Sequence, residues 1–243
     1  MTLRNKIVIV TGASSGIGKA TALHLSSLGA KVALASRNHG ALEELSKSIP
    51  GSLVVPTDMT DSVQIKAMVE STVAHFGRLD ALVNNAGRAY EATVEHADPE
   101  AFDLLFRLNV LGPMLALQAA VPHLRQAGGG AIVNIGSGTA FLAIPGYSVY
   151  SSTKRALIGF SLTARNELAA DHIRVSLVHP RLTATSFGEN KVRTEIPNGL
   201  PGGKLGADYS RGDPPEVIAA LVAKAILEGE AEYFAHEDMR KPR

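Results

Sequence analysis

Tyr150 and Lys154 are the two residues whose types and spacing most directly suggest chemistry. They stand four positions apart, so on a helix they share one face, one turn apart. A phenol alone is a poor proton donor or acceptor near neutral pH, because its unperturbed pKa is about 10. A neighbouring ammonium group favours the phenolate and lowers that pKa. The pair is a candidate general acid/base, although an exposed helix that carries a tyrosine and a lysine shows the same spacing.

A glycine-rich turn near the N-terminus is a candidate nucleotide site. It follows a β-branched run at 7–10, which predicts a buried strand, and precedes residues 19–28, which have helical spacing. Gly12 allows a tight turn, Gly16 lets the backbone approach a pyrophosphate, and Gly18 lets the helix pack closely on its strand. The helix N-terminus offers N–H groups and partial positive charge to the phosphates. The turn predicts dinucleotide binding; because its spacing is G-x-x-x-G-x-G, a βα turn without a ligand is the alternative.

The second predicted strand, at 32–35, ends in Ser36, Arg37 and Asn38. In NAD-binding proteins an acidic residue about 20 positions after the glycine turn holds the ribose 2′-hydroxyl. Ser36 stands 20 residues after Gly16, so no carboxylate is there to repel a 2′-phosphate. Arg37 offers a guanidinium that binds phosphate. This strand end therefore favours NADP (NADPH) over NAD, and a solvated strand-end arginine is the alternative.

Strand-like and helical segments alternate along the chain, which indicates an α/β fold. We expect a doubly wound, mostly parallel seven-stranded Rossmann sheet with helices on both faces, in one domain that spans residues 1–243. The expected strands are 7–10, 32–35, 53–55, 81–83, 131–135, 174–178 and 232–235. The expected helices are 19–28, 41–49, 63–76, 101–126, 150–169 and 214–228, the third with Asp61 or Ser62 as its N-cap.

The composition excludes several classes of protein. The 243 residues are 45% hydrophobic and 19% charged, which permits a large core and argues against disorder. A formal net charge of +1 gives no electrostatic footprint for nucleic acid. Cysteine is absent, and the eight histidines lack the HxxH and HExxH spacings of a metal site. Without a signal-peptide pattern or an apolar run near the ~20 residues that span a bilayer, we expect a soluble, cytoplasmic protein that binds neither nucleic acid nor membrane.

Two further segments follow predicted strands: Asp58 follows the third, and Asn84–Gly87 follows the fourth. Thr11–Gly18 precedes these two segments and Tyr150–Lys154 follows them. With the four in this order, the sequence resembles the short-chain dehydrogenase/reductase family in its single-domain form. The resemblance runs from near residue 5 to near residue 185. It implies an oxidoreductase with a nicotinamide cofactor on the sheet expected above.

The resemblance implies a catalytic set of Asn109, Ser137, Tyr150 and Lys154. Ser137 follows a predicted strand and stands 13 residues before Tyr150, which is the spacing of the catalytic serine in this family. Asn109 is a polar residue in an apolar run; in the family its backbone carbonyl, exposed by a local kink, holds a water beside the lysine. Taken singly, a hydrogen-bonded core asparagine and a turn serine are the alternatives for these two residues.

The resemblance also assigns the cofactor. Asp58 matches the position that contacts the adenine, while Thr183 and Thr185 match positions whose backbone and hydroxyl meet the carboxamide. Arg181 stands where the family has a glycine, so it either changes how the nicotinamide end is held or projects a charge toward the substrate. The full set of expected cofactor residues is Gly12, Ser14, Ser15, Gly16, Ile17, Gly18, Ser36, Arg37, Asn38, Asp58, Met59, Asn85, Ala86, Gly87, Tyr150, Lys154, Pro180, Thr183 and Thr185.

The sequence thus predicts an NADP-dependent oxidoreductase that transfers a hydride between nicotinamide and a carbonyl or secondary alcohol. Tyr150 is its general acid/base, and Ser137 donates to the substrate oxygen. A 3-oxoacyl-carrier-protein reductase ranks second, because Arg88–Glu91 does not match the usual continuation of those enzymes. A non-catalytic dinucleotide-binding regulator on the same fold ranks third, because all four positions of the proton relay are present.

The substrate is a small molecule that the sequence does not identify, and its direction of conversion stays open. Residues 187–212, rich in glycine, proline and asparagine, predict a mobile substrate lid. The helix at 101–126 is apolar on most sides, and small residues along 150–169 permit close helix packing, so we expect a homodimer or homotetramer. The residues expected to line a partly apolar substrate pocket are Thr139, Phe141, Ile144 and Tyr147.

Overall fold

The fold was taken from a computed structural model, which describes residues 2–185, 187, 192–193 and 212–240. Its main sheet has seven strands in the order β3-β2-β1-β4-β6-β7-β9, and every neighbouring pair is parallel. This order confirms the predicted doubly wound Rossmann sheet. The strands are β1 (Ile7–Thr11), β2 (Lys31–Ser36), β3 (Leu53–Pro56), β4 (Ala81–Asn84), β6 (Gly130–Ile135), β7 (Ile173–His179) and β9 (Glu232–Phe234).

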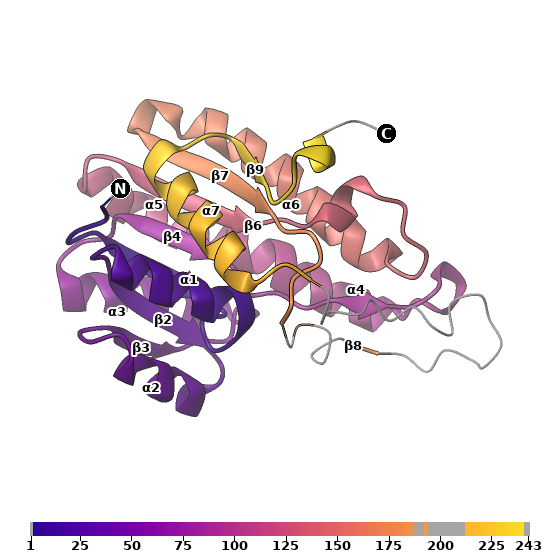
Figure 1. Cartoon of the computed structure of the whole chain (residues 1–243), viewed down its shortest axis with the longest axis horizontal. Coiled ribbons are helices and arrows are strands. Elements are labelled where there is room, and N and C mark those ends of the chain that lie inside the picture. The colour runs from indigo at the N-terminus through magenta and orange to yellow at the C-terminus, as the bar shows by residue number, and fades with distance from the viewer. Residues whose placement is uncertain (1, 186, 188–191, 194–211, 241–243) are drawn as a thin grey trace.

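Helices cover both faces of this sheet (Figure 1). The core on one face includes side chains of α1, α2 and α7, and the core on the other includes side chains of α3, α5 and α6. Strand β1 serves both cores: Val8 and Val10 point to the first, and Ile9 points to the second. This explains why its sequence is continuously apolar. The helices are α1 (Gly16–Ser27), α2 (His39–Lys47), α3 (Ser62–Phe76), α4 (Pro99–Phe106), α5 (Gly112–Gln126), α6 (Ser148–Glu167) and α7 (Pro215–Glu228).

The predicted single helix at 101–126 is interrupted. Helices α4 and α5 are joined by a π-helical turn, Arg107–Leu111, in which the N–H of Gly112 bonds the carbonyl of Arg107, five residues earlier. The cause lies in the sequence, because Pro113 has no N–H to donate to the carbonyl of Asn109. The interruption falls where the resemblance implied a local kink.

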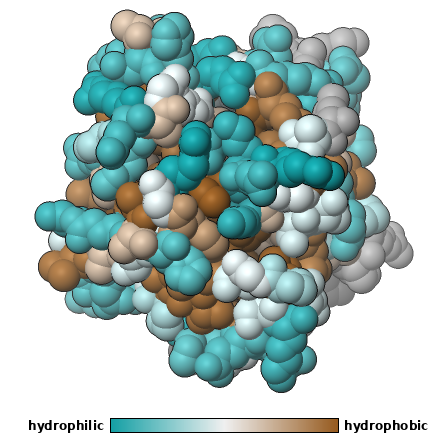
Figure 2. All heavy atoms as spheres, turned by 90° about the vertical axis from the view of Figure 1, so that its left-hand side faces the viewer, coloured by the Kyte–Doolittle hydropathy of each residue, from teal (hydrophilic) through white to brown (hydrophobic). Residues whose placement is uncertain are grey.

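The same stretch corrects one expectation about apolar runs. The 28 residues Pro99–Gln126 are long and apolar enough to cross a membrane by length and composition, and half of their most apolar window is buried in the protein. A buried core helix passes the same test. The face of the molecule that carries the N-terminus is a mosaic of hydrophilic and hydrophobic side chains (Figure 2).

A second, small sheet was not predicted. Strand β5 (Tyr90–Glu91) pairs in parallel with β8 (Val192–Arg193), which lies far along the sequence (Figure 1). Two-residue strands carry no periodicity, so this pairing could not be predicted from the sequence. Of the predicted lid at 187–212, residues 188–191 and 194–211 lie outside the described part of the chain.

Candidate active site

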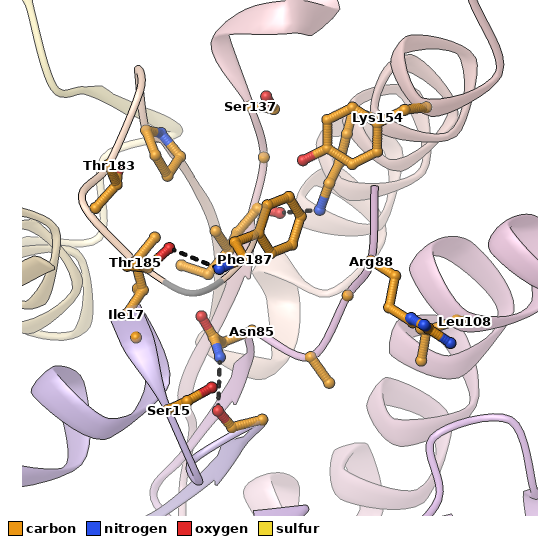
Figure 3. A pocket seen from close by; sticks show the side chains of 18 of the residues that line it. Ser15, Ile17, Asn85, Arg88, Leu108, Ser137, Lys154, Thr183, Thr185 and Phe187 are labelled. Carbon is orange, nitrogen blue, oxygen red and sulfur yellow. Dashed lines mark hydrogen bonds between the residues drawn. The ribbon is translucent and has the colours of Figure 1, made fainter. Parts of the chain in front are cut away.

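A cavity of about 880 Å³ opens at the carboxyl ends of the strands, where open α/β sheets bind ligands. Its volume is in the range of ligand pockets, which is roughly 300–1,000 Å³. The walls come from the β1–α1 turn, from the ends of β2, β3, β4, β6 and β7, and from α6 (Figure 3). The cavity therefore gathers segments that are up to 175 residues apart in the chain, from Gly12 to Phe187.

The glycine turn is built for close approach. Gly12 and Gly16 have φ of +65° and +51°, which side-chain-bearing residues rarely adopt. A Cβ on Gly12 would lie 2.8 Å from Nδ2 of Asn85, and one on Gly18 would collide with the carbonyl of Gly12. Gly18 does not line the cavity; its role is to let α1 pack against the turn. Ser15, the N-cap of α1, makes no side-chain cap, so the first N–H groups of the helix stay available for a phosphate.

The turn is fastened to the segment after β4. Asn85 donates from Nδ2 to the carbonyl of Thr11 at 2.9 Å, and its own N–H bonds Oγ1 of Thr11 at 3.0 Å. The N–H of Ala86 bonds the same oxygen at 3.1 Å. These hydrogen bonds connect two walls of the cavity, the β1–α1 turn and the segment after β4. The glycine cradle and the uncapped helix terminus fit the pyrophosphate of a dinucleotide.

The end of β2 brings Arg37 to the cavity next to Asp58, with Nη1 and Oδ2 at 3.9 Å. Asp58 also has a local role, because its Oδ1 accepts from the N–H and hydroxyl of Thr60 at 2.8 and 2.7 Å. Asn38 likewise lines the cavity while capping α2, since its Oδ1 accepts from the N–H of Ala41 at 3.1 Å. Asp58 and Asn38 thus each have a local turn or cap role and also line the cavity.

Tyr150 and Lys154 lie in the first turns of α6, and both side chains are buried where they meet the cavity. The ammonium nitrogen is 5.8 Å from the centre of the tyrosine ring. It also donates to the carbonyl of Ile135 at 2.8 Å, which ties α6 to the end of β6. Burial lowers the pKa of Lys154 to about 8, because the charged form loses hydration.

Ser137 stands directly after β6, across the cavity from the β1–α1 turn (Figure 3). Its hydroxyl is 2.9 Å from that of Thr139, and it accepts from the N–H of Thr139 at 3.2 Å. The flanking glycines continue the pairing with β7: Gly136 bonds the carbonyl of Val178, and Gly138 bonds that of Pro180, both at 2.8 Å. The serine is therefore held between two fixed backbone positions.

Asn109 differs from the other three predicted catalytic residues, because its fully buried side chain does not line the cavity. Its Nδ2 donates to the carbonyl of Arg88 and to the hydroxyl of Thr153, and its Oδ1 accepts from the N–H of Arg88. A Cβ on Gly87 would lie 3.1 Å from this Oδ1 and 3.8 Å from Nζ of Lys154. The side chain supports the cavity wall from behind. Its backbone carbonyl is the group that Pro113 leaves without the usual helical donor.

Arg181 occupies the predicted glycine position without strain, because it is not among the residues with positive φ in the described part of the chain. It lines the cavity together with Pro180, Thr183 and Thr185. The hydroxyl of Thr183 donates to the carbonyl of Arg181 at 3.4 Å, and that of Thr185 accepts from the N–H of Phe187 at 3.3 Å.

The cavity brings together every predicted cofactor residue except Gly18, and every predicted catalytic residue except Asn109. Phe141 was expected in the lining but packs against the rings of His179 and Phe234, with centroids 5.0 and 5.6 Å apart. Some lining residues were not assigned from the sequence, and for several of these the position at the end of a predicted strand was a signal that could have identified them. The lining residues that the sequence did not assign to the site are Thr57, Arg88, Leu108, Ile135, Gly136, Gly138, Leu142 and Leu182.

Comparison with known proteins gives a consistent result. The family model described as short chain dehydrogenase matches residues 6–196. An uncharacterised oxidoreductase of Methylorubrum extorquens is 38% identical over 232 residues, covering 91% of this chain and 90% of that protein. A 3-oxoacyl-[acyl-carrier-protein] reductase of Thermotoga maritima is 33% identical over 229 residues, covering 91% of this chain and 90% of that protein.

A solved structure extends the match to three dimensions. The crystal structure of a short-chain dehydrogenase/reductase from Burkholderia phymatum in complex with NAD has a TM-score of 0.89, at 26% identity, and covers 98% of this chain and 92% of that one. Sequence and fold therefore agree over nearly the whole length. The chain belongs to the short-chain dehydrogenase/reductase family of oxidoreductases.

Proposed function

We propose that the protein is an NADP-dependent oxidoreductase that interconverts a carbonyl compound and a secondary alcohol. One observation carries the proposal: Tyr150, Lys154 and Ser137 line the same cavity as the glycine turn. A proton-transferring phenol and a cradle for a dinucleotide thus face the same cavity. The cofactor supplies or accepts the hydride, and the protein supplies orientation and electrostatics.

In the direction of reduction, the substrate carbonyl oxygen accepts a hydrogen bond from Ser137, which stabilises the negative charge that develops there. Tyr150 donates its proton to this oxygen, so the product is an alcohol. In oxidation the same phenol accepts the proton. Lys154, with its nitrogen 5.8 Å from the ring centre, favours the phenolate electrostatically. The buried carbonyl of Ile135 fixes the lysine in that place.

The preference for NADP rests on Arg37, whose mostly exposed guanidinium lines the cavity at the end of β2. Asp58 lies 3.9 Å from it and partly offsets its charge. The similar protein from Burkholderia phymatum was solved with NAD, so the preference depends on this chain's own residues.

Arg37→Ala should raise the KM for NADPH at least ~10-fold, the loss of about one charge-assisted phosphate contact, and change the KM for NADH little. Steady-state kinetics with both cofactors measures this. Equal effects on the two cofactors would overturn the preference for NADP.

The reaction itself is tested by following NADPH oxidation at 340 nm with a panel of ketones, quinones and acyl thioesters. The proposal predicts turnover of at least one carbonyl class. A protein that binds NADPH and converts none of them would instead be a dinucleotide-binding regulator.

Reduction of a 3-oxoacyl thioester is the second candidate function, favoured by the 33% identity to the Thermotoga maritima reductase over 91% of this chain. Acetoacetyl thioesters of coenzyme A and of acyl carrier protein separate it from general carbonyl reduction. A kcat/KM for the carrier-protein thioester far above those for simple ketones would favour it.

A further inference from the structure

The backbone of Arg181 lies beside the serine loop, the segment Gly136–Gly138 that carries Ser137. A Cβ built on Gly138, the residue after Ser137, would lie 3.9 Å from Cα of Arg181. The N–H of Gly138 bonds the carbonyl of Pro180 at 2.8 Å, which fixes the two backbones against each other. The arginine side chain therefore starts within reach of a substrate whose carbonyl is held by Ser137.

The lining of the cavity is cationic. Among its described residues it carries Arg37, Arg88, Lys154 and Arg181, against the single carboxylate Asp58. The first arginine and the carboxylate lie together at the end of β2 and β3, and the lysine serves the tyrosine. Arg181 is the arginine that starts beside Gly138, in the half of the cavity that holds Ser137. With four cationic residues against one carboxylate, the described lining favours ligands of negative charge.

Arg181 is held by an ion pair that a ligand can replace. Its Nη1 is 3.4 Å from Oδ2 of Asp238, and the two side chains are 58% and 63% exposed. Such exposed pairs contribute little, because solvent screens them. Asp238 lies on the short turn Glu237–Arg240, and Cε of Met239 on that turn would be 2.9 Å from a Cβ on Gly138. The pair therefore stands at the rim of the cavity, near the serine loop.

We propose that Arg181 is a specificity-determining residue that binds an anionic carboxylate of the substrate, so that the protein acts on oxo acids. The inference rests on the carbonyl–alcohol function proposed above. A guanidinium pairs with a carboxylate through two parallel hydrogen bonds, which positions the ligand as well as attracting it. Apolar side chains of the same cavity, Leu142, Ile144 and Phe187, suit the carbon skeleton of such an acid.

The test compares 2-oxo, 3-oxo and 4-oxo acids with their methyl esters as substrates for NADPH-dependent reduction. For each chain length the ratio of kcat/KM for acid and ester is measured in wild type, Arg181→Met and Asp238→Asn. Dividing the ratio of a variant by that of the wild type cancels the different intrinsic reactivity of acids and esters. The matched control is Arg125→Met, which removes an arginine paired with Asp171 on the surface and outside the cavity lining.

For at least one chain length, Arg181→Met should lower the acid-to-ester ratio at least 10-fold, mainly through the KM of the acid. Asp238→Asn should raise the ratio, because it removes the competing carboxylate, and Arg125→Met should leave it unchanged. In wild type, added salt should lower kcat/KM for the acid more than for the ester.

An unchanged ratio in Arg181→Met, or a ratio that falls equally in Arg125→Met, would overturn this inference while leaving the carbonyl–alcohol function intact. Turnover of neither acids, esters nor neutral ketones would contradict that function and this inference together.

Discussion

At the scale of single residues, the burial of Lys154 in the candidate active site lowers the stability of the folded protein wherever this lysine is charged. Its ammonium is buried and donates a hydrogen bond to the carbonyl of Ile135. Burial lowers its pKa from the ordinary 10.5 to about 8. Between these values the unfolded chain binds more protons than the folded one, so stability contributed by this residue rises with pH across that window. Below pH 8 the penalty for burying the charge is present in full.

Lys154→Met removes this linkage. Without added cofactor, the unfolding free energy of the wild type minus that of the variant should grow by up to ~3 kcal/mol as the pH rises from 8 to 10.5. Denaturant titrations at a series of pH values measure this difference. A difference that stays flat or shrinks would show that the lysine is not held as a costly buried charge.

The residue scale also shows where sequence reasoning reached its limit. Tyr150 and Lys154 were identified from type and spacing, and Ser137 from the family resemblance; the structure places all three on the cavity wall. Phe141 was not placed correctly, because nothing in the sequence indicates that its ring packs against those of His179 and Phe234. Pairings between distant segments decide such cases.

At the scale of elements, the π-helical turn Arg107–Leu111 is the least regular feature next to the site. The sequence alone predicted one continuous helix, since its apolar pattern runs through 101–126. Pro113 carried the missing signal, because a proline removes the donor that the carbonyl four residues earlier requires. The strands β1, β2, β4, β6 and β7 were predicted well, since each contains an apolar run with side chains in both cores.

Pro113→Ala restores an N–H that can bond the carbonyl of Asn109 and close a regular helical turn. We expect a fall in kcat of about 10-fold, smaller than the ~100-fold or greater loss from removing the general acid/base itself, because the proton relay is disturbed and not removed. The dissociation constant of NADPH should change little. Steady-state kinetics and fluorescence titration measure the two quantities.

The matched control is Pro122→Ala, which removes a proline inside α5, away from the cavity lining. It should leave kcat unchanged. If both variants behave like the wild type, the π-turn has no part in the reaction.

At the scale of the whole molecule, the order of the seven strands is one of those that alternating strands and helices with right-handed crossovers permit. Two expectations at this scale stay proposals: one domain over residues 1–243, and a cytoplasmic location. So does assembly into a homodimer or homotetramer, which the partly exposed Phe102 and Leu104 on α4 support.

Replacing both residues, as Phe102→Glu with Leu104→Glu, should lower the mass of the assembly, because two carboxylates cannot be buried unpaired in an interface. Sedimentation equilibrium measures the mass. Val63→Glu, a change at a more exposed apolar residue on α3, is the control and should leave the mass unchanged. An unaltered mass in the double variant would place any interface elsewhere.

Turnover by Tyr150→Phe, measured together with NADPH binding, tests the central claim most directly. The variant loses one oxygen atom and keeps the ring that packs at the cavity wall. The account predicts a dissociation constant for NADPH close to that of the wild type and a kcat at least ~100-fold lower, the minimum for removal of a general acid/base. A variant that binds NADPH and reduces carbonyl substrates at the wild-type rate would contradict it.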